Sequence, residues 1–172
     1  MAVPERIRWA VATLDPGPDD RLLEIGCGPG VAVAAVCERL AGGQVVAIDR
    51  SATAIARAAK RNQDHVAAGR AVLLTVALED VAPADLLLGG RRFDKAFAMN
   101  VNLFWVRSPA RELATVRDLL APGGALYLFY GYGGDGPAPQ ASDALEGHLA
   151  DAGFAVEHRA GAATVCVVAT PR

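Results

Sequence analysis

The stretch LLEIGCGPG, residues 22–30, places an apolar run directly before three glycines at every second position. The apolar run is typical of a buried β-strand, and the residues that follow, from Val31 to Leu40, favour a helix. A strand that turns into a helix through closely spaced glycines lets the backbone pass near a ligand, with the free N–H groups of the helix facing it. The stretch therefore predicts a ligand-binding turn at the end of the first strand of an α/β fold.

Six further apolar runs of strand length follow this turn, and most are separated by stretches of helix length. Such alternation is the pattern of repeated βα units, which form a mostly parallel sheet. Only four residues, 160–163, lie between Arg159 and Thr164, and a parallel crossover needs about a dozen, so the last two strands are expected to be antiparallel. The expected strands are residues 21–26, 44–49, 71–77, 93–100, 124–130, 154–159 and 163–169.

Residues that favour helix ends divide the remaining sequence. A first helix, residues 5–14, is expected before the sheet and is followed by a turn at residues 15–18. Three later helices have recognisable boundaries. One has Ser51 as N-cap and is expected to end near Ala68, and the next has Ser108 as N-cap before Pro109 and is expected to end near Leu120. The last is expected to begin at Ser142 and Asp143, with Gly153 as the left-handed residue that closes it.

The composition limits the class of protein. A length of 172 residues with 52% hydrophobic residues suits one domain, residues 1–172, with residues 1–20 as N-terminal helix and linker and residues 21–172 as the core. A net charge of −2 argues against a broad attraction to nucleic acid. Charged residues interrupt the first apolar segment, so neither a signal peptide nor a membrane span is expected, and the predicted location is the cytoplasm. The three cysteines have no metal-binding spacing, so no metal is expected.

Asp49 closes the second expected strand, where an acidic side chain can accept hydrogen bonds from two ribose hydroxyls. It could also stabilise the N-terminus of the helix after Ser51, and both roles are compatible. The usual NAD fingerprint has a third glycine or alanine three residues after the second glycine, and Val31 stands there instead. Glu24 suits a cationic group better than a pyrophosphate. These features favour S-adenosylmethionine, which carries an ammonium and a sulfonium, over NAD.

The chain resembles the class I S-adenosylmethionine-dependent methyltransferases from Arg21 to Ala169. The motifs that carry the resemblance are EIGCGPG at 24–30, VVAID at 45–49, FDKAFAMN at 93–100 and LLAPGGAL at 119–126. The resemblance implies a Rossmann-like three-layer fold with a seven-stranded, mostly parallel sheet in the order 3-2-1-4-5-7-6 and an antiparallel strand 7. This order agrees with the antiparallel final pair that the short connection predicts.

The resemblance also implies a cofactor-binding role for individual residues. In the loop after the third strand, Ala77 stands where the family commonly has an aspartate that contacts the adenine amino group. The implied contacts are Glu24, Gly26, Cys27, Gly28 and Gly30 for the methionine end, Asp49 for the ribose hydroxyls, Arg50, Leu78 and Glu79 for the adenine, and Asn100 and Val101 for the methionine portion and the transferred methyl.

Methyl transfer from a sulfonium is an in-line displacement with a good leaving group, so the protein mainly aligns the reactants. An acceptor that is already ionised needs only orientation, whereas an alcohol or ammonium-type acceptor would need a base. Candidate residues beside the methyl follow the fourth and fifth strands, and the glycine-rich stretch 131–139 is a candidate cover. The candidates are Asn100, Asn102, Phe104, Trp105, Tyr130 and Tyr132.

The function implied by the resemblance is methyl transfer from S-adenosylmethionine to an unidentified small molecule, with S-adenosylhomocysteine as product. Family members that methylate a flipped base usually have Asn or Asp, two prolines and an aromatic residue after the fourth strand, whereas residues 100–103 read NVNL. Nucleic acid is therefore not the expected acceptor. The alternative is a non-catalytic cofactor-binding regulatory or partner module, and an NAD-dependent oxidoreductase comes third. The sequence predicts neither the acceptor nor the oligomeric state.

Overall fold

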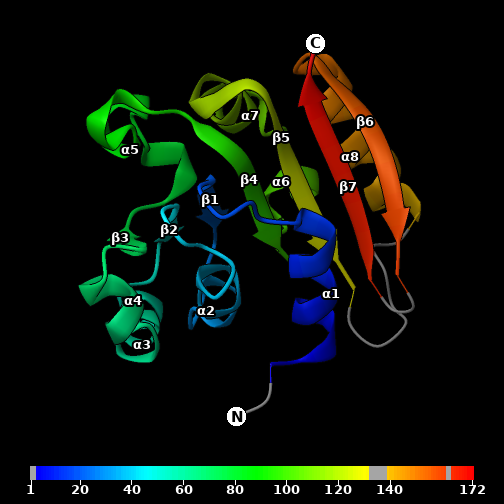
Figure 1. Ribbon diagram of the computed structural model, residues 1–172. Coiled ribbons are helices and arrows are strands. Elements are labelled where there is room, and N and C mark those ends of the chain that lie inside the picture. The colour runs from blue at the N-terminus through cyan, green and yellow to red at the C-terminus, as the bar shows by residue number, and fades with distance from the viewer. Residues whose placement is uncertain (1–2, 132–138, 162–163) are drawn as a thin grey trace.

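A computed structural model describes residues 3–131, 139–161 and 164–172 of the protein. Within these ranges seven strands form one sheet in the order β3-β2-β1-β4-β5-β7-β6 (Figure 1). Neighbours among β1 to β5 pair in parallel, whereas β7 is antiparallel to both β5 and β6. The predicted fold class is therefore confirmed. The strands are β1 Arg21–Ile25, β2 Gln44–Asp49, β3 Ala71–Thr75, β4 Phe93–Met99, β5 Leu120–Tyr130, β6 Phe154–Ala160 and β7 Val165–Pro171.

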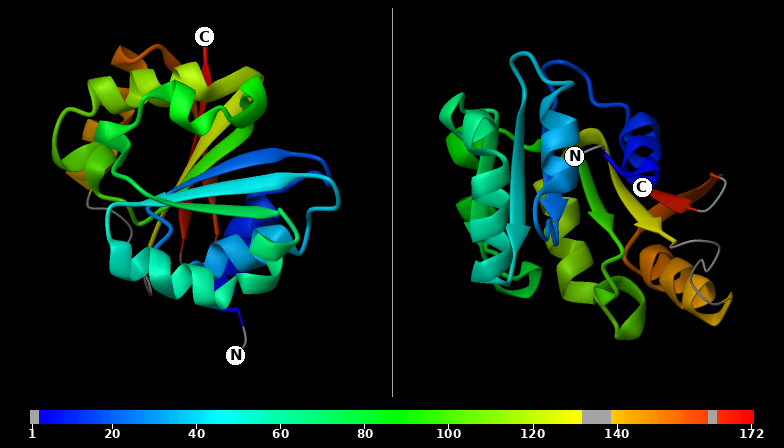
Figure 2. Two further views of the ribbon diagram at one scale, coloured as in Figure 1. Left: turned by 90° about the vertical axis from the view of Figure 1, so that its left-hand side faces the viewer. Right: turned by 90° about the horizontal axis from the view of Figure 1, so that it is seen from below.

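Helices cover both faces of the sheet, which gives three layers (Figure 2). One layer contains α1 to α3, and the other contains α5, α7 and α8. No helix in the described ranges is long and apolar enough to cross a membrane. The helical elements are α1 Glu5–Leu14, α2 Val31–Cys37, α3 Ala52–Arg61, α4 Gln63–Ala67, η1 Leu78–Asp80, α5 Pro83–Leu86, η2 Leu88–Gly90, α6 Leu103–Val106, α7 Ala110–Leu119 and α8 Pro139–Asp151.

The central strands are apolar along their length because both of their faces are buried. All five residues of β1 are buried, and its apolar side chains divide between two hydrophobic clusters, with Leu23 and Ile25 in the first and Leu22 in the second. The first cluster lies between the sheet and α5 to α8, and the second lies between the sheet and α1 to α3. In the second cluster Trp9 of α1 meets Phe129 of β5 edge to face, with ring centroids 6.0 Å apart. Helix α1 is thus part of the core on its face of the sheet.

The predicted start of the fifth strand was wrong, because β5 begins at Leu120 and includes the Pro-Gly-Gly segment. Phe93 pairs with Leu120, but Lys95 pairs with Ala125, so β5 has an irregularity between these two points. Gly123 has a φ of +80° within it, a conformation that glycine adopts at little cost. The segment ends α7 at Leu119, as predicted, but it joins the sheet at once instead of forming a separate turn.

Two predicted helix boundaries were also wrong. The helix expected to run from Ser51 to about Ala68 is broken at Asn62, whose buried side chain donates hydrogen bonds to the carbonyls of Gly30 (3.0 Å) and Ala58 (2.9 Å). Ser51 is the N-cap as predicted, and its Oγ accepts from the Ala54 N–H. Ser108 does not cap α7, because Pro109 is the cap residue and makes no side-chain cap bond.

The last helix begins earlier than predicted and ends as predicted. Helix α8 begins at Pro139, three residues before Ser142. Gly153 follows it with a φ of +83°, the left-handed conformation that was expected there. Its carbonyl accepts a hydrogen bond from the Arg172 N–H at 3.0 Å, so this turn also holds the end of β7.

Candidate functional site

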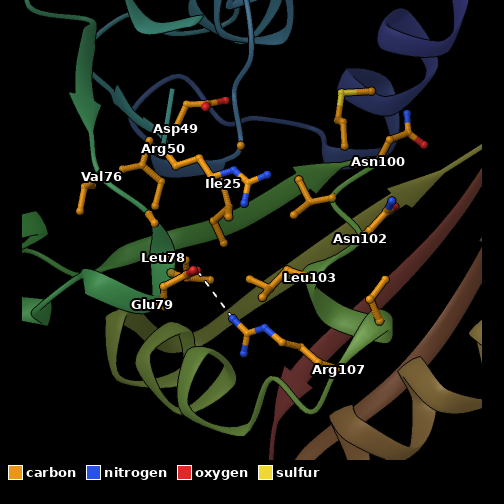
Figure 3. A pocket seen from close by; sticks show the side chains of 16 residues that line it. Ile25, Asp49, Arg50, Val76, Leu78, Glu79, Asn100, Asn102, Leu103 and Arg107 are labelled. Carbon is orange, nitrogen blue, oxygen red and sulfur yellow. Dashed lines mark ion pairs between the residues drawn. The ribbon is translucent and has the colours of Figure 1, made fainter. Parts of the chain in front are cut away.

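A cavity of about 610 Å³ lies at the carboxyl ends of the parallel strands, where the strand order reverses between β1 and β4 (Figure 3). Connections from neighbouring strands leave in opposite directions at such a point, so a crevice forms between them. Four segments line the cavity: the end of β1, the end of β2, the loop after β3 and the segment after β4. Their lining residues are 25–26, 48–50, 76–79, and 99–103 with 106–107.

The turn between β1 and α2 forms one wall of the site. The N–H groups of Gly26 and Cys27 donate to the carbonyl of Ile48 at 2.8 and 3.1 Å, which ties the turn to β2. Gly26 has a φ of +72°, and a Cβ there would lie 2.7 Å from the Val101 Cγ2. Gly28 also has a positive φ, +53°, but a Cβ there would meet nothing within 4 Å. Gly26 therefore permits close packing against the segment after β4, whereas Gly28 leaves open space at the turn.

Asp49 organises this turn and also lines the cavity. Its Oδ2 accepts from the Gly28 N–H at 2.9 Å, and its Oδ1 accepts from the Ser51 N–H at 2.8 Å. The contact with Ser51 places Asp49 at the start of α3, as the predicted helix N-terminal role requires, whereas the bond to Gly28 was not predicted and the ribose role stays a prediction. Each carboxylate oxygen can accept more than one hydrogen bond, so capacity remains for a ligand hydroxyl.

Glu24 lies within the sheet beneath the turn and does not line the cavity. The residue is 2% exposed, and among the described residues its Oε2 has no hydrogen-bond partner. Burial, together with the nearby negative charge of Asp49, raises the pKa of Glu24 to about 8. A buried carboxyl without a partner would gain most from a positive charge nearby.

The ends of β4 and β5 are joined through Asn100, which has a left-handed φ of +53°. Its backbone N–H donates to the Phe129 carbonyl at 2.8 Å, and its Oδ1 accepts from the Gly131 N–H at 3.2 Å. The Tyr130 hydroxyl donates to the Val101 carbonyl at 3.1 Å, and burial raises the pKa of this tyrosine. Hydrogen bonds therefore fix the cavity wall around residues 100–101.

The structure brings eight of the predicted site residues to the cavity and leaves others outside it. Phe104 is fully buried in the core, and Trp105 is half-buried beside it. Tyr132 and most of stretch 131–139 lie outside the described residues. The residues at the cavity are Gly26, Asp49, Arg50, Leu78, Glu79, Asn100, Val101 and Asn102, whereas Glu24, Cys27, Gly28, Gly30, Trp105 and Tyr130 are not among its lining residues.

Arg107 is a cavity residue that the sequence analysis missed. Its Nη2 lies 2.6 Å from Oε1 of Glu112 and 3.8 Å from Oε2 of Glu79, which also lines the cavity. Glu112 is buried within α7. Glu79 lies in the loop after β3, whereas Arg107 and Glu112 lie on either side of the start of α7, so their contact depends on how these elements pack and no local sequence pattern indicates it. Among the described residues no group of three or more His, Cys, Asp or Glu is arranged to hold a metal ion.

Comparisons with known proteins agree with this geometry. Residues 23–126 match the methyltransferase domain family. An uncharacterized protein of Synechococcus sp. is 36% identical over 109 residues, which are 63% of this chain and 25% of that protein. The chain spans only 25% and 31% of the lengths of two curated relatives that it matches.

Solved structures share the fold at low sequence identity. The magnesium protoporphyrin IX methyltransferase of Synechocystis PCC 6803, solved with bound S-adenosylmethionine, is 18% identical with a TM-score of 0.66 over 96% of this chain and 76% of its own. The (4+2)-cyclase SpnF is 18% identical with a TM-score of 0.73 over 96% and 80%. The chain belongs to the methyltransferase domain family. Its strand order is the one that the resemblance to class I methyltransferases implied.

Proposed function

We propose that the protein binds S-adenosylmethionine in the cavity at the strand ends and transfers its methyl group to a small molecule, with S-adenosylhomocysteine as product. The observation that carries this proposal is the joining of the β1–α2 turn to β2 through Asp49. The Asp49 carboxylate orders the turn through the Gly28 N–H and also borders the cavity. The same carboxylate thus orders the glycine turn and can accept hydrogen bonds from the ribose hydroxyls of a ligand.

The residues at the cavity fit the chemistry of this cofactor. S-adenosylmethionine carries an ammonium, a cationic sulfonium, two ribose hydroxyls and an adenine amino group. Asp49 and Glu79 offer carboxylates at the cavity, and Glu24 lies beneath the turn with an oxygen that has no hydrogen-bond partner among the described residues. The two carboxylates at the cavity suit a cationic ligand with many hydrogen-bond donors, and they would repel a pyrophosphate. The open space at Gly28 leaves room for a ligand beside the turn.

The residues of the chain align and shield the reactants in this proposal. When bound, S-adenosylmethionine supplies a methyl group on a sulfonium that leaves as a neutral thioether. Asn100 is held by its two hydrogen bonds, so it keeps the wall at the end of β4 in a fixed position. Met99, Val101 and Leu103 contribute apolar side chains to this wall. Positioning of this kind can lower a barrier by about 7–11 kcal/mol.

The proposed reaction does not require a general base to deprotonate the molecule that receives the methyl group. Among the candidate residues that the structure describes after β4 and β5, Tyr130 has a side chain that can act as an acid or a base, but its hydroxyl donates to the Val101 carbonyl. Burial raises the pKa of Tyr130, so its phenolate does not form near neutral pH. Catalysis by alignment alone suits an acceptor that is already nucleophilic. A cavity of about 610 Å³ is within the usual range of small-molecule sites, which is consistent with a cofactor of this size at the strand ends.

Turnover tests this function against binding without catalysis. The protein is incubated with S-adenosylmethionine and a metabolite extract, and S-adenosylhomocysteine and new methylated products are measured by mass spectrometry. Release of S-adenosylhomocysteine above the level of the heat-denatured protein and of Asp49→Ala is expected. Binding with no release would favour the non-catalytic module. That alternative has support because a cyclase shares this fold, so the fold does not by itself establish methyl transfer.

A further inference from the structure

The end of helix α3 contacts the backbone of the β1–α2 turn. Arg61 Nε donates to the Pro29 carbonyl at 3.0 Å. Asn62 Nδ2 donates to the Gly30 carbonyl, also at 3.0 Å. Helix α3 lies beside α2 on one face of the sheet, so its end is next to the point where α2 begins (Figure 2). Two neighbouring side chains at the end of α3 thus hold two neighbouring carbonyls of the turn.

The side chain of Asn62 is buried, and its hydrogen bonds exceed what the local backbone needs. The Gly30 carbonyl also accepts from the Ala34 N–H at 3.3 Å. The Ala58 carbonyl, the second acceptor of Nδ2, also accepts from the Asn62 N–H at 2.9 Å. Both carbonyls therefore have a backbone partner without the amide. The Asn62 Oδ1 has no hydrogen-bond partner among the described residues, and a buried oxygen in this state costs free energy. Satisfying the backbone does not explain an amide at this position, whereas connecting the turn to α3 does.

Gly30 lies so close to the end of α3 that no side chain fits there. A Cβ at Gly30 would be 2.6 Å from Asn62 Nδ2 and 2.8 Å from the Ala58 Cβ. The other side of the turn is joined to the end of β2 by backbone and carboxylate hydrogen bonds. The turn is thus fixed from both sides, and Gly28, where a Cβ would meet nothing within 4 Å, is the point at which it stays open.

We infer that Arg61 and Asn62 are positioning residues, which hold the turn in the shape that receives the amino-acid end of the cofactor. This inference rests on the proposed function and on the methionine end lying at this turn, as the family resemblance implies. A turn that is already ordered loses little conformational freedom when a ligand binds, so the ligand binds more tightly. Without the two side chains, a ligand with an amino-acid end should lose affinity, and a ligand without one should not.

The test compares calorimetric titrations of S-adenosylhomocysteine and 5′-methylthioadenosine. Both ligands contain adenosine and a thioether, but only the first has an amino-acid end. Asn62→Ala removes the amide, and the ratio of the two affinities is expected to fall by about three- to tenfold, the effect of losing one hydrogen bond. The affinity for 5′-methylthioadenosine should stay close to that of the wild type. An unchanged ratio, including an equal loss for both ligands, would assign Asn62 a purely structural role and overturn the inference.

Arg61→Met gives a second test in a variant that should fold, because Arg61 is exposed. Methionine keeps much of the side-chain length and lacks a donor for the Pro29 carbonyl, so the ratio should fall by about two- to threefold. Arg57→Met, the same change at another exposed position of α3, is the matched control and should leave the ratio unchanged. Equal ratios in Arg61→Met and Arg57→Met would overturn the role of Arg61. If Asn62→Ala does not fold, Arg61→Met decides the whole inference.

The proposed function and the inference fail in different ways. If the wild-type protein does not bind S-adenosylhomocysteine at all, the proposed function is wrong, and the inference about Arg61 and Asn62 is wrong with it. If the wild-type protein binds S-adenosylhomocysteine and the variants keep the wild-type ratio of affinities, only the inference about Arg61 and Asn62 is wrong.

Discussion

Glu24 is a buried residue of the sheet whose ionisation makes the stability of the fold depend on pH. Burial and the charge of Asp49 raise its pKa to about 8, whereas the ordinary value is 4.5. The folded chain therefore holds this proton more tightly than the unfolded chain does. It follows that the contribution of Glu24 to stability is most favourable below about pH 4.5 and declines as the pH rises toward 8.

Glu24→Gln should remove this pH dependence, because the amide has the size of the acid and does not ionise. The free energy of unfolding of the wild type, relative to that of the variant, is expected to decline by up to about 1.4 kcal/mol per pH unit between about pH 5 and pH 8. Urea denaturation of both proteins across this range measures the difference. A difference that stays constant with pH would show that Glu24 ionises normally in the folded protein.

Asp49→Ala tests the carboxylate that joins the turn to the cavity. The variant is expected to bind S-adenosylhomocysteine more weakly by at least about 1.5–3 kcal/mol, the range for a hydrogen bond that involves a charged group. Isothermal titration calorimetry measures the loss, with Asp118→Ala, an exposed aspartate of α7, as control. Unchanged affinity in Asp49→Ala would remove this residue from the site.

At the scale of elements, the β1–α2 turn requires glycine for two different reasons: a left-handed backbone conformation and a lack of space for a side chain. Alanine at Gly26 or at Gly28 is placed in a left-handed conformation that costs about 1–2 kcal/mol. Only at Gly26 does the new methyl also collide with Val101, at 2.7 Å. Gly26→Ala should therefore destabilise the protein more than Gly28→Ala, as measured by chemical denaturation.

A double variant isolates the collision. Val101→Ala is expected to recover part of the stability lost in Gly26→Ala and none of the stability lost in Gly28→Ala. Equal losses in the two glycine variants, or no recovery with Val101→Ala, would contradict the packing described for this turn.

The order of elements could be predicted because it depends on local patterns. Apolar runs identified the seven strands, and the short connection at residues 160–163 identified the antiparallel pair β6–β7. The errors arose where distant contacts decide the structure. The break at Asn62 depends on its hydrogen bond to Gly30, and the early start of β5 depends on the pairing of Leu120 with Phe93.

At the scale of the whole molecule, the sheet joins the two hydrophobic clusters, because the same strands contribute to both. One of the two tryptophans lies against each cluster, Trp9 on one face and Trp105 on the other. That the chain forms a single domain stays a prediction, and these tryptophans can test it.

Trp9→Phe and Trp105→Phe each leave one tryptophan to report on one face of the sheet. If the two faces unfold as one unit, the urea midpoint from tryptophan fluorescence should coincide with the midpoint from far-ultraviolet circular dichroism in each variant. Separate midpoints for the two probes would show that the faces unfold independently.

The site residues that stand at the ends of strands could be predicted from the sequence. Asp49 and Asn100 were identified because each ends a strand at the same edge of the sheet, and the structure places both at the cavity. Arg107 and Glu112 could not be identified, because their contact depends on how α6 and α7 pack. The cofactor roles of all these residues stay predictions, since no comparison tests them.

The proposed ligand of the cavity is S-adenosylmethionine rather than a dinucleotide. Calorimetric titration of the wild-type protein with S-adenosylmethionine, S-adenosylhomocysteine and NAD tests this most directly. We expect saturable, one-to-one binding of the first two ligands and no measurable binding of NAD. Binding of NAD, with no binding of either of the other two ligands, would contradict it.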